Sequence, residues 1–396
     1  MASPRLLYVG SSFPFGKNDT FFAAEFAGLR RLGIDVRAIP VRPRGELTTV
    51  AAGDVAVRRP LLDGAIALAA VQETLRAPRT VARAVLMLFR SPSPNVLVRN
   101  LVALPKALWL GRQARNGSNH IHALWAGPPA TVAMIASMVS GVPWSFTGHS
   151  DDLAAENLLP SKFESAAFVR FIARAWLDRA LTNAPHVDHS RWVLLHLGID
   201  VPADWTPPPP PGDPAVVLMS ARISPEKRHD TLVRATRLLI DRGRSVEVWL
   251  AGWGDGAAAV ETDVQRAGLT DVVKFLGYVP NHEIRSWLAS HRVDIVVLPS
   301  DSEGLPYSLI EALAYGVPAV ASAVGGVGEL LGDGCGELIG PGDAVGLADA
   351  IDRYLESSDH RASCADAGRA RVEREFSAEI AAQTMAELCR LLPDAG

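Results

Sequence analysis

Two glutamates at a fixed spacing are the residues best suited to chemistry in this chain of 396 residues. Glu303 and Glu311 lie eight positions apart within residues 298–318. A carboxylate accepts hydrogen bonds on both oxygens, so each glutamate could hold a pair of neighbouring hydroxyls. Their separation would bring them to different parts of one extended ligand. The alternative is a surface helix with an acid near its first turn and Glu311 turned toward solvent.

The segment around the two glutamates is typical of a strand, a loop and a helix that begins near Leu305. Pro306 suits the first helical turn, where its missing N–H group would have no partner in any case. Gly316 and Pro318 would end this helix. We therefore expect the loop around Gly304 to turn backbone N–H groups and a positive helix terminus toward a phosphate or a sugar oxygen.

Two cations follow a second strand, predicted over residues 215–220. Arg222 and Lys227 lie five residues apart in a loop that leads into a helix. They could grip a diphosphate from two sides and neutralise its charge as it leaves. A solvated basic loop is the alternative, because arginine and lysine are common on surfaces. Lysine occurs only five times among the 39 basic residues, so its presence here favours a functional role.

A histidine follows a third strand, predicted over residues 143–147. His149 would lie in the loop at the carboxyl end of this strand, where it could bond a reacting sugar or polarise an acceptor. A purely structural histidine is the alternative. For His120 and His122, which flank a strand of buried character, we expect a place in the core or in the wall of a cleft.

Motifs for a metal ion or a dinucleotide cofactor are missing from the sequence. The adjacent pair Asp151 and Asp152 is not a spaced Asp-x-Asp pair, and no cluster of histidine or cysteine ligands occurs, so no metal is expected. The glycine-rich runs at residues 10–16 and 252–256 follow strands but lack the G-x-G-x-x-G spacing of a dinucleotide site. These glycines would let the backbone approach a ligand, or turn the chain.

Strand-like and helix-like stretches alternate along the chain, which is the pattern of a parallel α/β sheet. Five consecutive prolines at residues 207–211 interrupt the alternation and favour an extended linker. We therefore predict two Rossmann-like domains, residues 1–205 and 206–376, facing each other across a deep cleft. The predicted strands cover residues 6–9, 35–39, 120–125, 143–147, 215–220, 246–251, 272–276, 295–299 and 319–322, with helices over 20–32 and 131–140.

Composition limits the partners. The chain has 39 basic and 43 acidic residues, a net charge of −4, which argues against a general nucleic-acid binder. Three cysteines give no disulfide framework and suit a reducing compartment. No apolar run has the length of a signal peptide or a membrane span, so the expected location is the cytoplasm.

One segment departs from this balance, because residues 74–115 hold eight basic side chains and no acidic one. Ordinary helices with solvated basic faces would explain it. The alternative is a basic and apolar surface for a membrane-bound or anionic acceptor, with peripheral contact to the inner face of the membrane.

Together, these motifs resemble glycosyltransferase family 4, whose members are retaining nucleotide-sugar enzymes with the GT-B fold. The family's E-x7-E motif matches Glu303 and Glu311, and its R-x4-K pair matches Arg222 and Lys227. The resemblance spans most of the chain and is strongest over residues 216–331. Further matches are a hinge strand ending in Gly-Ile-Asp at residues 196–200, and residues 250–254 and 275–279.

The N-terminal domain is similar to a branch of the family that acts in exopolysaccharide synthesis. Residues 13–21, 120–126 and 145–152 match that branch, with Asn18-Asp19 where Ser-Glu is common. The branch implies a lipid-linked saccharide as the acceptor, in polysaccharide biosynthesis. A soluble natural product, such as an aminocyclitol antibiotic precursor, is the alternative acceptor. A nucleotide-sugar 2-epimerase and a non-catalytic nucleotide-sugar sensor are the rival activities.

The resemblance also implies a role for each matched residue. Arg222 and Lys227 would hold the donor diphosphate. Glu303 would contact the sugar hydroxyls near the anomeric carbon, and Glu311 the nucleotide ribose. Transfer would retain configuration without a metal or other cofactor, and a final helix within residues 377–396 would cross back onto the N-terminal domain. The predicted catalytic residues are His149, Arg222, Lys227 and Glu303, and the predicted donor-binding residues are Gly10, Ser11, Ser12, Arg222, Lys227, Gly252, Glu303, Gly304, Leu305, Pro306 and Glu311.

Overall fold

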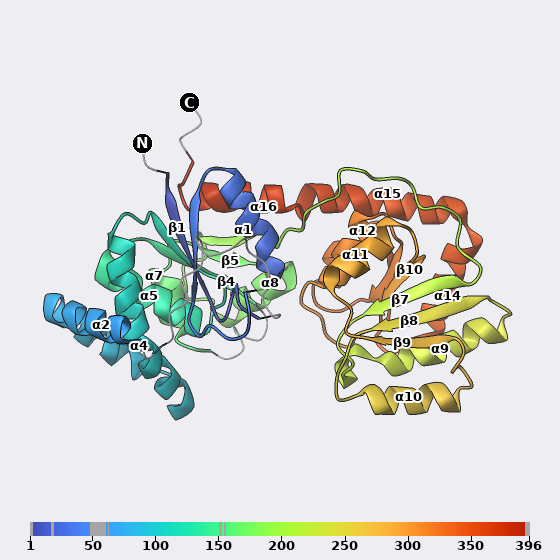
Figure 1. The fold of residues 1–396 in the computed structure, drawn as a ribbon, viewed down its shortest axis with the longest axis horizontal. Coiled ribbons are helices and arrows are strands. Elements are labelled where there is room, and N and C mark those ends of the chain that lie inside the picture. Colours follow the sequence, from blue (N-terminus) through green and yellow to red (C-terminus); the bar gives the residue numbers. More distant parts are fainter. Residues whose placement is uncertain are drawn as a thin grey trace. The chain divides into compact units, whose positions relative to one another are not determined.

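The computed structural model of the chain describes residues 3–16, 20–47, 61, 63–149, 153 and 156–392. The chain forms two compact units, each built on a six-stranded parallel sheet (Figure 1). Unit 1 comprises residues 1–198 and 378–396, and unit 2 comprises residues 199–377. Unit 2 begins at Ile199, seven residues before the division at residue 206 that the prolines predict. The Ile199 N–H donates to the carbonyl of Phe376 at 2.8 Å, which ties Ile199 to the end of unit 2.

The sheet of unit 1 has the strand order β2-β1-β3-β4-β5-β6. Tyr8 on β1 pairs with Ala38 on β2 and with His122 on β3. Strands β1, β3 and β4 are buried almost throughout, as expected where helices cover both faces of a parallel sheet. The strands are β1 (Arg5–Gly10), β2 (Asp35–Pro40), β3 (His120–Ala123), β4 (Trp144–Gly148), β5 (Val169–Phe171) and β6 (Trp192–Leu194).

Two strand predictions in unit 1 need correction. The strand expected over residues 120–125 ends at Ala123. The hinge strand expected over residues 196–200 is also wrong, because β6 ends at Leu194 and Ile199 makes an isolated bridge to Ser377 instead.

The helices of unit 1 begin and end where local chemistry dictates. The Asp63 carboxylate caps α2 by accepting from the N–H of Ala65 at 2.9 Å, and Gly141 ends α5 with a left-handed conformation. Gly111 lets α4 cross α5 closely, since a Cβ there would lie 2.2 Å from Val139. The helices are η1 (Thr20–Phe22), α1 (Ala23–Arg31), α2 (Gly64–Arg76), α3 (Pro78–Leu88), α4 (Pro94–Arg115), α5 (Pro128–Ser140), α7 (Leu159–Ser165), α8 (Arg174–Asn183) and α16 (Ala378–Leu388).

The last helix, α16, belongs to unit 1 although the chain reaches it from unit 2. It packs against α1 so closely that a Cβ on Gly28 would lie 2.7 Å from the Cβ of Ala382. Among the helices of the described residues, none is both long and apolar enough to span a membrane.

The sheet of unit 2 has the strand order β12-β11-β10-β7-β8-β9. The chain runs from β7 outward to β8 and β9, then returns to β10 and runs outward to β11 and β12. The order therefore reverses between β7 and β10, and in parallel sheets loops diverge from such a point to leave a ligand crevice. The strands are β7 (Ala215–Ser220), β8 (Val246–Ala251), β9 (Val273–Gly277), β10 (Ile295–Leu298), β11 (Ala319–Ser322) and β12 (Glu337–Ile339).

Helices cover both faces of this second sheet, with α9 and α10 on one face and α11 and α12 on the other (Figure 1). The core between them is formed by aliphatic side chains such as Val217, Leu250, Val297 and Leu309. The helices are η2 (Pro225–Lys227), α9 (His229–Asp241), α10 (Ala257–Arg266), α11 (Asn281–Ala289), α12 (Tyr307–Ala314), α13 (Val327–Leu331), α14 (Ala344–Glu356) and α15 (Ser358–Glu375).

The helix that follows β10 begins later than predicted. We expected it to open near Leu305 with Pro306 in its first turn, but α12 begins at Tyr307 and Pro306 is its extended N-cap, with ψ of 112°. A residue that precedes proline is disfavoured in helical conformation, so Leu305 stays in the loop. The loop between β10 and α12 is therefore longer, and it carries Glu303.

Candidate functional site

The reversal between β7 and β10 brings the two predicted motifs of unit 2 together. The loop after β7 carries Arg222 and Lys227, and the loop after β10 carries Glu303. The Lys227 Nζ donates to Oε1 of Glu303 at 2.6 Å, although 76 residues separate them in sequence. The Glu303 side chain is almost buried, at 8% exposure, and that of Lys227 is 20% exposed. An ion pair of this burial fixes the two loops to each other.

Arg222 takes a different partner from the one that the spacing of the motif suggests. Its guanidinium is largely exposed and pairs with Glu226 at 2.7 Å, within the same loop. The hydroxyl of Ser224 donates to the same carboxylate oxygen at 2.6 Å. The hydrogen bond from Ser224 is the largest cause that lowers the pKa of Glu226 to about 2, and a backbone hydrogen bond and the bond from Arg222 act in the same direction. The sequence had not indicated Glu226, and its position between the two cations was the available signal.

Glu311 lies on α12 and is buried in the same unit. Its two carboxylate oxygens accept from Nδ2 of Asn281, at 2.9 and 3.0 Å. Burial raises the pKa of Glu311, against the opposing effect of the Asn281 hydrogen bond. Asn281 was not predicted, and only its place at the start of the helix after β9 could have pointed to it. The alternative of an outward, solvated Glu311 is excluded by this burial.

Three glycines allow the loops at this edge of the sheet to pack backbone against backbone. A Cβ on Gly252 would lie 1.8 Å from the carbonyl oxygen of Ala221, next to Arg222. A Cβ on Gly254 would lie 2.1 Å from the carbonyl oxygen of Ile223. Gly252 thus packs against the backbone of the loop that carries Arg222, whereas the roles predicted for it from the sequence were approach to a ligand or a turn of the chain.

The third of these glycines is Gly325, for which the sequence indicated no role. It has a φ of +54°, and a Cβ there would lie 1.8 Å from the carbonyl oxygen of Glu303. The N–H of Gly326 donates to the carbonyl of Gly304 at 2.9 Å. The loop after β11 therefore supports the loop that carries Glu303. The available signal for Gly325 in the sequence was the pair Gly325-Gly326, which follows the strand predicted over residues 319–322.

Arg228 completes the set of charged groups at these loops. It has a left-handed φ of 54° and contacts Asp230 at 2.9 Å and Asp301 at 3.0 Å. Both carboxylates raise the pKa of its guanidinium, with Asp230 the larger cause. Asp301 lies in the loop after β10, so two ion pairs, Lys227–Glu303 and Arg228–Asp301, join the loops after β7 and β10.

In unit 1, His149 follows β4, as the sequence predicted. Its Nε2 lies 3.1 Å from the carbonyl oxygen of Leu124, and its ring stacks on Trp125 with the centroids 4.0 Å apart. Burial lowers the pKa of His149 to about 3, so the imidazole is neutral at neutral pH. A neutral ring can donate or accept a hydrogen bond but carries no charge to a ligand.

His120 and His122 are core residues of unit 1, as expected. His122 lies 2.7 Å from the hydroxyl of Ser145 and 2.9 Å from that of Thr147. Both histidines stack on Phe168. Burial lowers the pKa of His120 to about 4 and that of His122 well below its usual range.

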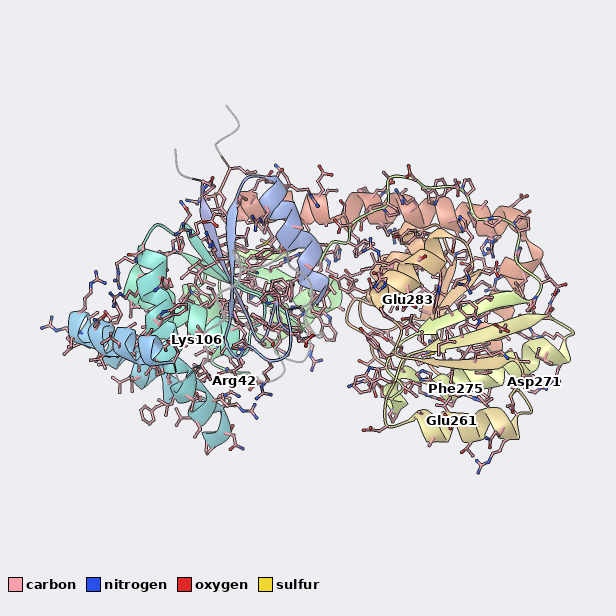
Figure 2. The ribbon with its side chains drawn as sticks, viewed as in Figure 1. Arg42, Lys106, Glu261, Asp271, Phe275 and Glu283 are labelled. Atoms are coloured by element: carbon pink, nitrogen blue, oxygen red, sulfur yellow. The ribbon has the colours of Figure 1, made fainter. Side chains whose placement is uncertain are left out.

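The predicted residues Gly10, Ser11 and Ser12 form the loop after β1, also in unit 1. Backbone bonds of 2.9 Å connect Gly10 to Val41 and Ser11 to Arg42. The loop after β2 is itself held by Lys106 on α4, labelled in Figure 2. The Lys106 Nζ donates to the carbonyls of Pro40 and Val41, and burial lowers its pKa to about 8.

Some predicted groups lie outside the described residues, namely Asn18, Asp19, Asp151 and Asp152. Of the others, unit 2 brings Lys227 and Glu303 into contact, with Arg222 in the loop after β7 and Glu311 on α12. His149 and residues 10–12 belong to unit 1. Within the described part of the chain, no group of histidine, cysteine, aspartate or glutamate side chains is arranged to hold a metal ion.

Comparison with known proteins decides the family. A family model described as Glycosyl transferases group 1 matches residues 204–371. The 2-deoxystreptamine glucosyltransferase of Streptomyces kanamyceticus is 30% identical over 287 residues, covering 66% of this chain and 72% of that protein. The chain belongs to the group 1 glycosyltransferases. The resemblance to glycosyltransferase family 4 seen in the motifs is thereby confirmed.

A second relative matches a shorter part of the chain, and a solved structure matches nearly all of it. The amylovoran biosynthesis glycosyltransferase AmsK of Erwinia amylovora is 34% identical over 186 residues, 45% of each chain, so the match spans about half the length of that relative. Among solved structures, HepE of Anabaena in complex with UDP has a TM-score of 0.74 at 19% identity, covering 98% of this chain and 100% of HepE. That likeness confirms the GT-B fold.

Proposed function

We propose that this chain transfers a sugar from a nucleotide-sugar donor to an acceptor hydroxyl, with retention of configuration and without a metal. The contact between Lys227 and Glu303 at the strand reversal of unit 2 carries the proposal. It joins the predicted diphosphate cation to the predicted sugar-binding carboxylate in the type of crevice where α/β sheets bind ligands.

The charges of unit 2 suit the departure of a diphosphate. Arg222 and Lys227 each hold a carboxylate, Glu226 and Glu303 respectively, which a phosphate group would replace as their partner. Two cations then stabilise the negative charge that grows on the leaving diphosphate. Because side chains supply this charge, the reaction does not require a metal. Glu303, once released, accepts from sugar hydroxyls, and attack on the face that the diphosphate leaves retains the configuration.

Glu311 would hold the ribose of the nucleotide. Its two oxygens already accept from Asn281, which shows that the carboxylate is held in one orientation. A carboxylate held in this way suits a pair of neighbouring ribose hydroxyls. HepE was solved with UDP, so UDP-sugars are the first donors to test.

For the acceptor, we propose a lipid-linked saccharide in polysaccharide biosynthesis. The relative AmsK, named for amylovoran biosynthesis, supports it. The enzyme would act in the cytoplasm, with residues 74–115 in peripheral contact with the inner face of the membrane. A soluble aminocyclitol is the second candidate, because the match to the 2-deoxystreptamine glucosyltransferase covers 72% of that protein.

Transfer assays with Lys227→Ala and Glu303→Ala test the proposal. Both variants are expected to lose most activity, while the control Lys274→Ala, on β9 of the same unit, keeps it. Nuclear magnetic resonance of the product gives the anomeric configuration, and activity in a chelating buffer tests metal independence. Near wild-type transfer by both site variants would contradict the proposed roles.

A further inference from the structure

Helices α2 and α3 of unit 1 expose an unusual amount of apolar surface. Leu68, Val71 and Leu75 recur at helical spacing along α2, and Leu75 is 77% exposed. Leu86 and Phe89, at the end of α3, are 68% and 62% exposed. Single exposed apolar residues are ordinary, but several on adjoining helices mark an interaction surface.

Helix α3, the turn that follows it and α4 carry exposed arginines. Arg79, Arg83, Arg90 and Arg99 are all exposed, and none has an acidic partner among the residues that the structure describes. The sequence has no aspartate or glutamate at residues 74–150. We call these four arginines and the five apolar side chains above the arginine–apolar face.

The opposite sides of these helices are already buried within unit 1. Ile66 and Ala69 on α2, and Val81 and Ala84 on α3, belong to its core. The three helices also contact one another, and α4 packs along α5. The exposed residues are therefore not needed to build the unit, and the stability of the fold does not explain their apolar character.

We infer that the arginine–apolar face docks on a membrane surface that contains anionic lipids. Apolar side chains flanked by cations can enter the boundary between headgroups and acyl chains, while arginines contact phosphate groups. A second copy of the chain fits this face poorly, because association through it would bring unpartnered arginines together. An anionic bilayer supplies both the negative charge and the apolar layer.

The inference deepens the proposal of a lipid-linked acceptor and rests on it for its biological meaning. Binding to vesicles is nevertheless measured without donor, acceptor or turnover. A protein that binds vesicles but transfers no sugar would refute the proposed function alone. A protein that transfers sugar but ignores vesicles would refute the docking face alone.

Sedimentation with vesicles tests the charged part of the face. The full chain is expected to bind phosphatidylcholine vesicles that contain phosphatidylglycerol, and to bind less as salt increases. Each arginine near such a surface contributes about 1 kcal/mol, so Arg83→Gln with Arg90→Gln is expected to weaken binding roughly 30-fold. The control pair Arg30→Gln with Arg174→Gln removes the same charge from α1 and α8 and is expected to bind as the wild type does.

The apolar part is tested by Leu86→Ser with Phe89→Ser, which should abolish sedimentation without lowering the thermal unfolding midpoint, since both side chains are exposed. Three results would overturn the inference. They are equal binding to vesicles of phosphatidylcholine alone, unchanged binding of both double variants, and a dimer in analytical ultracentrifugation that Leu86→Ser with Phe89→Ser dissociates.

Discussion

Replacing Glu311 by glutamine separates what this residue does for binding from what it does for stability. The side chain is buried on α12, and both of its oxygens accept from Asn281. Glutamine keeps the size and one carbonyl oxygen but removes the charge. In the proposed site, that charge strengthens two hydrogen bonds to the nucleotide ribose.

The expected loss of affinity follows from those bonds. Hydrogen bonds to a charged group contribute about 1.5–3 kcal/mol. Glu311→Gln should therefore weaken binding of the nucleoside diphosphate roughly 10- to 150-fold.

The effect on stability has the opposite sign. Because burial raises the pKa of Glu311 above its usual value of 4.5, the folded chain holds this proton more tightly than the unfolded chain does. The protonated Glu311 therefore stabilises the fold fully below pH 4.5, and this stabilisation is lost as the pH rises through the raised pKa. At pH well above the raised pKa, the variant should be at least as stable as the wild type.

Calorimetric titration with the nucleotide and chemical denaturation near neutral pH measure the two effects. Glu261→Gln, on α10 and labelled in Figure 2, is a control that removes one exposed charge from the same unit and should change neither. Unchanged nucleotide affinity in Glu311→Gln would refute the role of the carboxylate. A loss of several kcal/mol of stability would show that the charge supports the fold.

Three further predictions concern Gly325, Lys162 and His149. Gly325→Ala should reduce transfer and cost about 1–3 kcal/mol of stability, because its Cβ would meet the backbone of the loop that carries Glu303. Gly328→Ala, with open space on α13, should be neutral or stabilising, and equal effects of the two substitutions would contradict this prediction. Lys162→Met should lower the free energy of unfolding in chemical denaturation by about 1–3 kcal/mol, because Nζ of the buried Lys162 donates to the carbonyls of Ala126 and Gly127 at 2.6 and 3.1 Å. An unchanged free energy of unfolding would contradict this prediction. Burial lowers the pKa of His149 to about 3, so the unfolded chain binds a proton at this residue at a higher pH than the folded chain does. The unfolding midpoint should therefore fall as the pH drops from 6.5 towards 3. His149→Gln should weaken this pH dependence, and an equal dependence in the variant would refute the prediction.

Strands with continuous apolar runs could be predicted from the sequence to the residue. Strands β7, β8 and β11 begin and end where the pattern placed them. The strands without a prediction, β5, β6 and β12, have three residues each, and Arg170 and Glu337 stand within two of them. A charged residue in so short a run removes the apolar signal, although tertiary contacts satisfy the charge.

The elements that carry the candidate site were predictable, but the partners of its residues were not. The spacing of Arg222 and Lys227 suggested one shared anion, whereas each has its own carboxylate. The contact of Lys227 with Glu303 depends on which strands are neighbours, and a single sequence does not give that order. The same holds for Asn281, whose contact with Glu311 joins two separate helices.

The most direct test of the central claim is calorimetric binding of UDP, GDP and dTDP to the wild type and to Arg222→Ala and Lys227→Ala, without added metal. A donor site at the loops after β7 and β10 predicts saturable binding of one nucleotide class that both variants weaken strongly. No binding of any nucleotide by the folded protein, or equal binding by the variants, would contradict the site.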